Sequence, residues 1–159
     1  TSLTMNDSWG FNITDTKFKS VGDLIGYLAR AAGANANLLL NIGPRPDGTI
    51  QPEAVERLRA IGEWLRVNGR SIYGTRGGPV PPREWGVTTQ RGDTVFVHVL
   101  NWPDRVLSLP ALSSRVTGAT MLANGARVEI AQTSSGLTLT LPTDDHQSPD
   151  RVVALVVKR

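Results

Sequence analysis

The sequence has 159 residues, of which 40% are hydrophobic and 19% charged, and its formal net charge at pH 7 is only +3. It contains no apolar run long enough to cross a bilayer and no basic block interleaved with aromatic residues, which argues against a membrane span and a nucleic-acid partner. The absence of cysteine excludes disulfides and thiolate chemistry, and with only His98 and His146 a Ser-His-Asp or two-histidine metal site is not expected.

Residues 20–33 have the pattern of an amphipathic helix. Ser20 is a plausible N-cap, with Asp23 at the third position of a capping box. Gly33 suits a left-handed C-terminal cap. The apolar residues recur at helical spacing and predict a single buried face, which comprises Leu24, Ile25, Leu28, Ala31 and Ala32.

Residues 37–42 predict a strand, and the loop that follows is rich in glycine and proline. The strand is apolar at consecutive positions, which is typical of a parallel strand covered on both faces. In the loop, Asp47 and Gly48 form a turn signal, and we favour this turn over a catalytic part for Asp47. Asn41 could hydrogen-bond across the end of the strand or stabilise the loop, and we favour the loop.

A second helix is predicted over residues 52–68, with Pro52 in its first turn. The expected inner stripe consists of Ala54, Leu58, Ile61 and Leu65, and the expected water-facing residues are Glu53, Arg57, Arg59, Glu63 and Arg66.

The texture of the sequence changes at TRGGPVPPREWG, and we place a linker at residues 77–84. Beyond it, residues 85–159 contain short alternating segments such as TVFVHVL, separated by turn signals such as Asn124-Gly125, which predicts an antiparallel β-sandwich. We expect His98 to be a structural histidine, His146 to lie in a solvated loop, and Trp85 and Trp102 to be core or interface residues rather than sugar platforms.

The first 76 residues supply only two β/α units, although a full β/α barrel needs roughly 200 residues or more. The predicted fold class is therefore α/β plus all-β: the last two β/α units of a (β/α)8-like barrel at residues 1–76, followed by the sandwich at residues 85–159. Trp64 and Tyr73 are expected to pack between the two. Because the chain starts with threonine and shows no leader pattern, we expect either a removed leader or a piece of a longer protein.

Four segments stand in the order and spacing of a known family: SWGF at residues 8–11, NLLLNIGPRPDGTI at 37–50, LRAIGEWLRVNGRSIYGTR at 58–76 and HVLNWP at 98–103. Together they resemble the C-terminal part of an α-L-fucosidase of glycoside hydrolase family 29. The resemblance is dense over residues 1–76 and thin afterwards. It implies a barrel followed by a sandwich, and it places the glycine- and proline-rich loop at the catalytic rim of the barrel.

The resemblance also implies a retaining mechanism with two carboxyl groups, both on segments upstream of this chain, so that no catalytic residue is assigned here. It implies a fucosylated glycan as substrate, no cofactor and no metal, and an exported or lysosomal intact enzyme. Trp9 and Phe11 are the candidate substrate-binding residues, because an aromatic wall suits the methyl group and apolar face of fucose. The competing interpretation is that both fill the barrel edge. Asp7, the carboxylate beside this segment, is more simply a turn residue.

Two further hypotheses stay open. The chain could be a non-catalytic carbohydrate-binding or interaction module that kept the sandwich and part of a barrel, or a truncated reading frame that does not fold alone. The linkage preference, the oligomeric state and the compartment are left open by the sequence.

Overall fold

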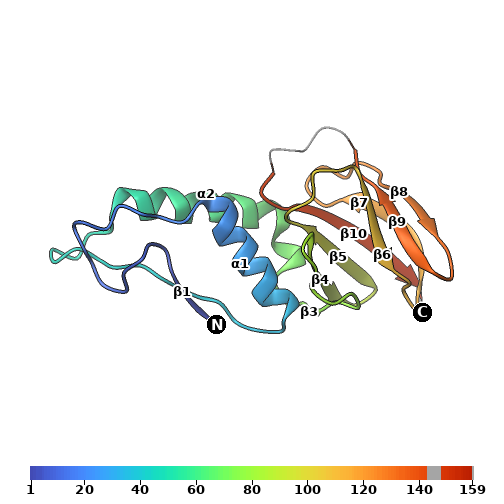
Figure 1. Ribbon diagram of the computed structural model, residues 1–159, viewed down its shortest axis with the longest axis horizontal. Coiled ribbons are helices and arrows are strands. Elements are labelled where there is room, and N and C mark those ends of the chain that lie inside the picture. The colour runs from blue at the N-terminus through green and yellow to red at the C-terminus, as the bar shows by residue number, and fades with distance from the viewer. Residues whose placement is uncertain (143–147, 159) are drawn as a thin grey trace.

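The computed structural model describes residues 1–142 and 148–158, and His146 therefore lies outside the described residues. The molecule is elongated (Figure 1): two helices and a pair of short strands form one end, and antiparallel sheets form the other. The chain is β-rich, with two α-helices among its described elements.

The helical end is built on two parallel strands, β1 (Ser2–Thr4) and β2 (Leu39–Asn41), with helix α1 (Val21–Gly33) between them in sequence. Their helix-facing side chains pack with α1 and α2 (Pro52–Asn68) in a cluster centred on Met5, Leu24 and Ala54. The prediction that this strand is covered on both faces is wrong, because Leu39 is 58% exposed on the opposite face. Among the described residues, the helices cover one face of this strand pair, and Leu39 is exposed on the other.

Helix α1 begins as predicted and ends differently. Ser20 and Asp23 form the complete capping box, with the Asp23 amide donating to the Ser20 hydroxyl at 3.0 Å. Gly33 is not the left-handed cap, since Asn35 takes the positive φ of 56° instead. Gly33 is required for another reason: a Cβ there would overlap the Val87 side chain, so glycine lets the helix end approach the sheet.

Helix α2 starts at Pro52, as expected, and runs into a short 3-10 helix, η1 (Gly69–Ser71). Two side chains depart from the predicted faces. Leu58, expected in the inner stripe, is 39% exposed. Arg57, expected in water, is partly buried: its Nε donates to the Lys19 carbonyl at 2.7 Å and its guanidinium lies 5.1 Å from the centre of the Phe18 ring. The cation–π contact and the hydrogen bond turn Arg57 toward the loop before α1.

The other end consists of two antiparallel sheets that pack face to face. The five-stranded sheet has the order β3 (Arg76–Gly77), β4 (Gly86–Arg91), β5 (Thr94–Val99), β10 (Arg151–Lys158), β7 (Arg115–Met121), and the three-stranded sheet has the order β6 (Val106–Pro110), β9 (Gly136–Thr140), β8 (Glu129–Gln132). Buried valine and leucine side chains from both sheets form one core cluster, which includes Trp85 and against which Trp102 packs. The expectation that both tryptophans are core or interface residues is confirmed, since Trp85 is buried in the core and Trp102 is partly buried against it.

The outer face of the five-stranded sheet is covered by the helices. Phe96 on β5 and Val152 on β10 pack against Ile25 and Trp64 in a second cluster. Both faces of β5 are consequently buried, and its apolar Val95, Phe96 and Val97 stand at consecutive positions. Trp64 therefore occupies the predicted position between helices and sheets, whereas Tyr73 does not, because it is 60% exposed.

His98 is a fully buried structural histidine, as predicted. Its Nδ1 lies 2.6 Å from the Asp150 carboxylate, and its Nε2 lies 3.3 Å from the Thr89 hydroxyl, which itself donates to the Ser71 carbonyl at 2.6 Å. This network links β4, β5 and the segment before β10 to the 3-10 helix after α2, so it joins the two ends of the molecule.

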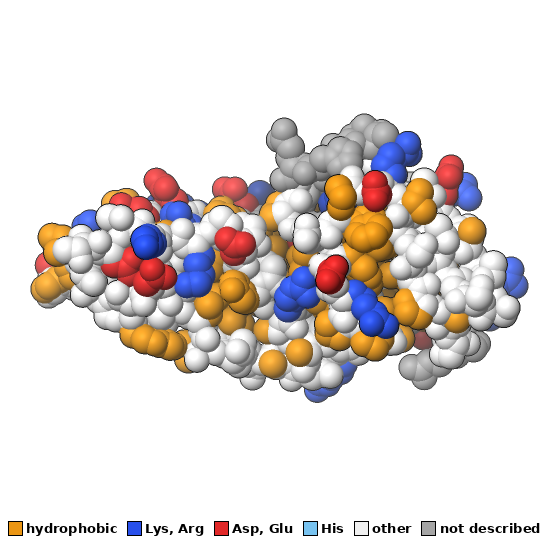
Figure 2. Space-filling view, viewed as in Figure 1, with side chains coloured by type: hydrophobic (Ala, Val, Ile, Leu, Met, Phe, Trp, Pro, Cys, Tyr) orange, Lys and Arg blue, Asp and Glu red, His pale blue; other side chains and the backbone are white. Residues whose placement is uncertain are grey.

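The surface carries both signs of charge. Figure 2 shows acidic and basic side chains interspersed over one face, with hydrophobic side chains gathered around the junction between the helices and the sheets. No helix among the described residues has the length and apolar character needed to span a membrane.

Candidate rim site at the ends of the parallel strands

The loops that follow β1 and β2 meet at one edge of the strand pair. Because the two strands are parallel, their carboxyl ends lie at the same edge, and parallel α/β folds place their ligands at that edge. The first loop contains Trp9 and Phe11, and the second is the glycine- and proline-rich loop after Ile42.

Direct contacts join these two loops. The Asn41 side-chain amide donates to the Trp9 carbonyl at 2.7 Å. A Cβ on Gly43 would lie 2.6 Å from the Gly10 carbonyl carbon and from the Phe11 nitrogen, so only glycine fits there. Asn41 therefore bonds across the end of the strand to the first loop, rather than within the glycine- and proline-rich loop that we favoured, and the Trp9 segment lies against the end of β2.

The first loop is organised by Asp15, which the sequence reasoning missed. Its carboxylate accepts from the backbone amides of Asp7 at 3.0 Å and Lys17 at 3.2 Å. A hydrogen bond from the Ser8 side chain, followed by these backbone bonds, lowers the pKa of Asp15 below its ordinary 3.8. The bond that Asp7 makes in this loop comes from its backbone amide, whereas the prediction was a turn formed by its side chain. The signal available in the sequence was the NITD run, in which Asn12 and Asp15 are residues that cap local turns.

The second loop contains the predicted turn. Asp47 accepts from the Thr49 backbone amide at 2.9 Å and from its hydroxyl at 2.7 Å, and Gly48 has a φ of +83°. The Thr49 backbone and side-chain bonds lower the pKa of Asp47 below 3.8. Asp47 is therefore a turn residue, as predicted.

The two candidate residues differ in their surroundings. Trp9 is 58% exposed at the rim. Phe11 is partly buried and lines a hollow of about 480 Å³ between the loops, together with Ile13, Asp15, Thr16, Phe18, Arg45, Gln51 and Glu53. The structure brings both aromatic residues to one rim, but only Phe11 lines this hollow.

Two rim carboxylates, those of Asp15 and Asp47, lack the raised pKa of a general acid. A general acid at neutral pH needs a raised pKa, whereas hydrogen bonds lower the pKa of both Asp15 and Asp47. Within residues 1–142 and 148–158, no group of three histidine, aspartate or glutamate side chains is placed to hold a metal ion. What this rim offers chemically is aromatic surface and a fixed backbone.

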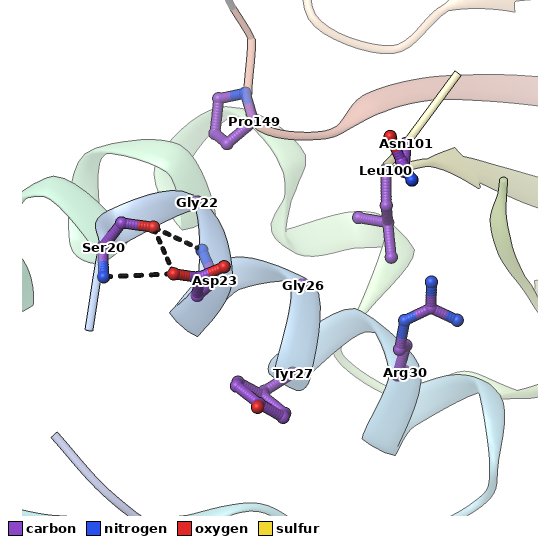
Figure 3. A pocket seen from close by; sticks show the side chains of 9 residues that line it. All are labelled: Ser20, Gly22, Asp23, Gly26, Tyr27, Arg30, Leu100, Asn101 and Pro149. Atoms are coloured by element: carbon purple, nitrogen blue, oxygen red, sulfur yellow. Dashed lines mark hydrogen bonds between the residues drawn. The ribbon is translucent and has the colours of Figure 1, made fainter. Parts of the chain in front are cut away.

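A second hollow, of about 580 Å³, lies between α1 and the sheets (Figure 3). Three of its polar side chains have partners: Ser20 and Asp23 bond each other, and Arg30 donates to the carbonyls of Arg83 and Glu84 at 3.3 Å. Tyr27 is 48% exposed beside it. This hollow offers packing space rather than reactive groups.

Known proteins resemble this chain over most of its length. The sequence model of the family described as alpha-L-fucosidase matches residues 1–70. An alpha-L-fucosidase of Branchiostoma floridae is 41% identical over 145 residues, which is 86% of this chain and 32% of the relative. The plasma alpha-L-fucosidase of Homo sapiens is 32% identical over 156 residues, which is 89% of this chain and 33% of the relative.

Solved structures of fucosidases also superpose on this chain. The alpha-L-fucosidase isoenzyme 1 of Paenibacillus thiaminolyticus superposes with a TM-score of 0.90 at 30% identity, covering 99% of this chain and 39% of that protein. The alpha-fucosidase of Thermotoga maritima, solved with a mechanism-based inhibitor, gives a TM-score of 0.85 at 28% identity over 98% of this chain and 39% of its own. This chain spans about a third of the length of the curated relatives that it matches.

Proposed function

Because this chain belongs to the α-L-fucosidase family, we propose that it is the C-terminal part of a retaining α-L-fucosidase that hydrolyses terminal α-linked fucose from glycans. The catalytic nucleophile and the acid/base residue would lie upstream of residue 1. This part of the chain would supply one side of the sugar site.

The proposal includes an architecture. Residues 1–76 would be the end of a (β/α)8-like barrel, residues 77–84 a linker and residues 85–159 the C-terminal sandwich. The exposed face of the strand pair supports this architecture. Leu39 is 58% exposed on the face away from the helices, and in a β/α barrel that face points inward and is buried by the other strands. The strands of relatives three times as long would supply the missing neighbours.

The observation that carries the proposal is the contact between the two rim loops. The Asn41 bond to the Trp9 carbonyl fixes an aromatic segment at the carboxyl ends of parallel strands, which is where barrel enzymes bind substrate. Trp9 and Phe11 would form an apolar wall against the 6-methyl group and one face of fucose. Trp9 is 58% exposed and Phe11 lines a hollow, which leaves both accessible for that contact.

The chemistry would require two carboxyl groups about 5 to 5.5 Å apart, one to attack the anomeric carbon and one to protonate the leaving oxygen. Asp15 and Asp47 do not suit the acid, since their hydrogen bonds favour the ionised form. The rim residues of this chain would therefore bind and orient the sugar without moving a proton.

The test is hydrolysis of nitrophenyl α-L-fucoside by the protein that carries this chain together with its upstream sequence. We expect turnover with retention of anomeric configuration, read by NMR of the first-formed fucose, and no turnover by residues 1–159 alone. Trp9→Ala should raise KM about tenfold or more, because a buried aromatic–sugar contact contributes roughly 1.5 kcal/mol or more. Turnover by residues 1–159 alone at the rate of the longer protein would contradict the upstream placement of the carboxylates.

The alternative of a non-catalytic carbohydrate-binding module is resolved by the same experiment. Binding of fucosylated glycans by the longer protein, without hydrolysis, would favour the module over the enzyme.

A further inference from the structure

We propose that Asn41 is a positioning residue that holds the Trp9 segment in register with the sugar site. This inference rests on the proposed function, because it assumes that Trp9 meets the substrate. Asn41 itself need not touch the sugar.

Asn41 is bonded to the first loop at two points. Its backbone carbonyl accepts from the Met5 amide at 3.1 Å, which continues the pairing of β2 with the end of β1. Its side-chain amide donates to the Trp9 carbonyl at 2.7 Å, four residues further along the loop. A carbonyl oxygen can only accept, so a residue at position 41 must carry a donor to make this bond.

Gly43 allows the backbone of the first loop to approach the end of β2 closely. Residues 41 and 43 project to the same face of an extended chain, and the missing Cβ of Gly43 makes room for the Gly10 carbonyl and the Phe11 nitrogen. Within the described residues, the side-chain bonds made by Asp15 and Asn12 stay inside the loop and leave its distance from β2 undetermined. The contacts of Asn41 and Gly43 therefore fix the position of the Trp9 backbone relative to β2.

Loss of the Asn41 donor should act on substrate binding more than on the chemical step. The Trp9 segment would gain alternative positions, and binding a sugar would then have to select one of them. An aromatic wall contacts the sugar in the ground state and the transition state alike, so weakening it should raise KM with a small effect on kcat.

The chain offers a matched pair of asparagines for the test. Asn41→Asp removes the donor and places a carboxylate against the Trp9 carbonyl. Asn124 uses its side-chain oxygen, accepting from the Ala126 amide at 3.0 Å in an exposed turn, so Asn124→Asp keeps its bond. Asn41→Ala removes the donor without adding charge. Comparison with Asn41→Asp therefore separates the loss of the hydrogen bond from the effect of the added carboxylate.

Each variant is made in the protein that includes the upstream sequence. KM and kcat are measured with nitrophenyl α-L-fucoside, and hydrogen exchange is measured on peptides that span residues 6–16. We expect Asn41→Asp and Asn41→Ala to raise KM about tenfold, which corresponds to one lost hydrogen bond, to change kcat by less than about threefold, and to speed exchange in the loop. Asn124→Asp should match the unmodified protein in all three quantities.

Two results would overturn the inference. Unchanged KM and unchanged exchange in both Asn41 variants would show that the bond does not hold the loop, and faster exchange with unchanged KM would show a structural role without a part in substrate binding. Failure of the proposed function is seen separately and earlier, as absence of fucosidase activity in the unmodified protein. That result would remove the basis of the inference as well.

Discussion

The two ends of this molecule use the same kinds of residues and differ in how completely their surfaces are covered. In the sheet end, the two inner faces bury each other, and the helices cover the outer face of β5 and β10. At the helical end, β1 and β2 have helices on one face, and apolar Leu39, Trp9 and Ile13 are 58%, 58% and 80% exposed. The comparison shows that a pair of short parallel strands with helices on one face leaves apolar side chains exposed, whereas two facing sheets do not.

Among the substitutions predicted here, loss of the contact between the two ends should lower the free energy of unfolding most. Phe96→Ala deletes a side chain that is 1% exposed between the sheet and the helices, and should lower the free energy of unfolding by about 3–5 kcal/mol. Urea unfolding followed by tryptophan fluorescence measures it. Val156→Ala on the neighbouring β10 is the control, because Val156 is 50% exposed, and it should cost about 0.5 kcal/mol or less. A loss below about 1 kcal/mol for Phe96→Ala would show that the two ends do not depend on this contact.

A second prediction separates two glycines of α1. Gly33→Ala should destabilise the chain by about 1–3 kcal/mol, because its Cβ would overlap Val87 and lie 3.2 Å from the Thr88 carbonyl oxygen. Gly26→Ala should instead stabilise it by about 0.5–1 kcal/mol, since a Cβ at Gly26 meets nothing within 4 Å and alanine favours a helix. Thermal melts of both variants show whether each substitution lowers or raises the melting temperature. Equal effects of the two substitutions would contradict the close approach of α1 to β4.

The smallest predicted effect concerns the rim loop alone. The Thr49 backbone amide, and then its hydroxyl, lowers the pKa of Asp47, so the carboxyl should titrate in NMR with a midpoint below 3.8. A lowered folded pKa means that the stabilisation is present above the unfolded pKa and is lost as pH falls through the folded pKa. Thr49→Ala removes only the hydroxyl bond and should move the midpoint up toward 3.8. A midpoint at or above 3.8 in the unmodified chain would contradict the turn geometry.

Local rules predicted the elements well where the signal lay in neighbouring residues. The Ser20–Asp23 capping box, Pro52 in the first turn of α2 and the Asp47–Gly48 turn each depend on contacts within a few residues. Burial predictions failed where the answer depended on distant chain segments. The prediction for Gly33 failed because its constraint is Val87 on another element, and the prediction for the strand at residues 37–42 failed because Leu39 is 58% exposed.

The candidate site follows the same division. The family resemblance selected Trp9 and Phe11 and placed the glycine- and proline-rich loop at the catalytic rim, and the parallel pairing of β1 with β2 in the structure brings both loops to one edge. The bond from Asn41 to the Trp9 carbonyl could only be expected in general terms, because an asparagine at a strand end can meet many partners. The role of Asp15 was missed, since several polar residues in the same loop could have accepted those amides equally well.

Labelling of a cysteine placed at Leu39 tests most directly whether the bare face of β1 and β2 is the interior of a larger enzyme. The chain has no cysteine, so Leu39→Cys and Val156→Cys each introduce one thiol at a position that is 58% or 50% exposed. In residues 1–159 alone, both should react readily with a maleimide, as quantified by peptide mass spectrometry. With the upstream sequence present, we expect the Leu39→Cys thiol to be protected and the Val156→Cys thiol to react at an unchanged rate. Equal labelling of the Leu39→Cys thiol in both forms would contradict the account.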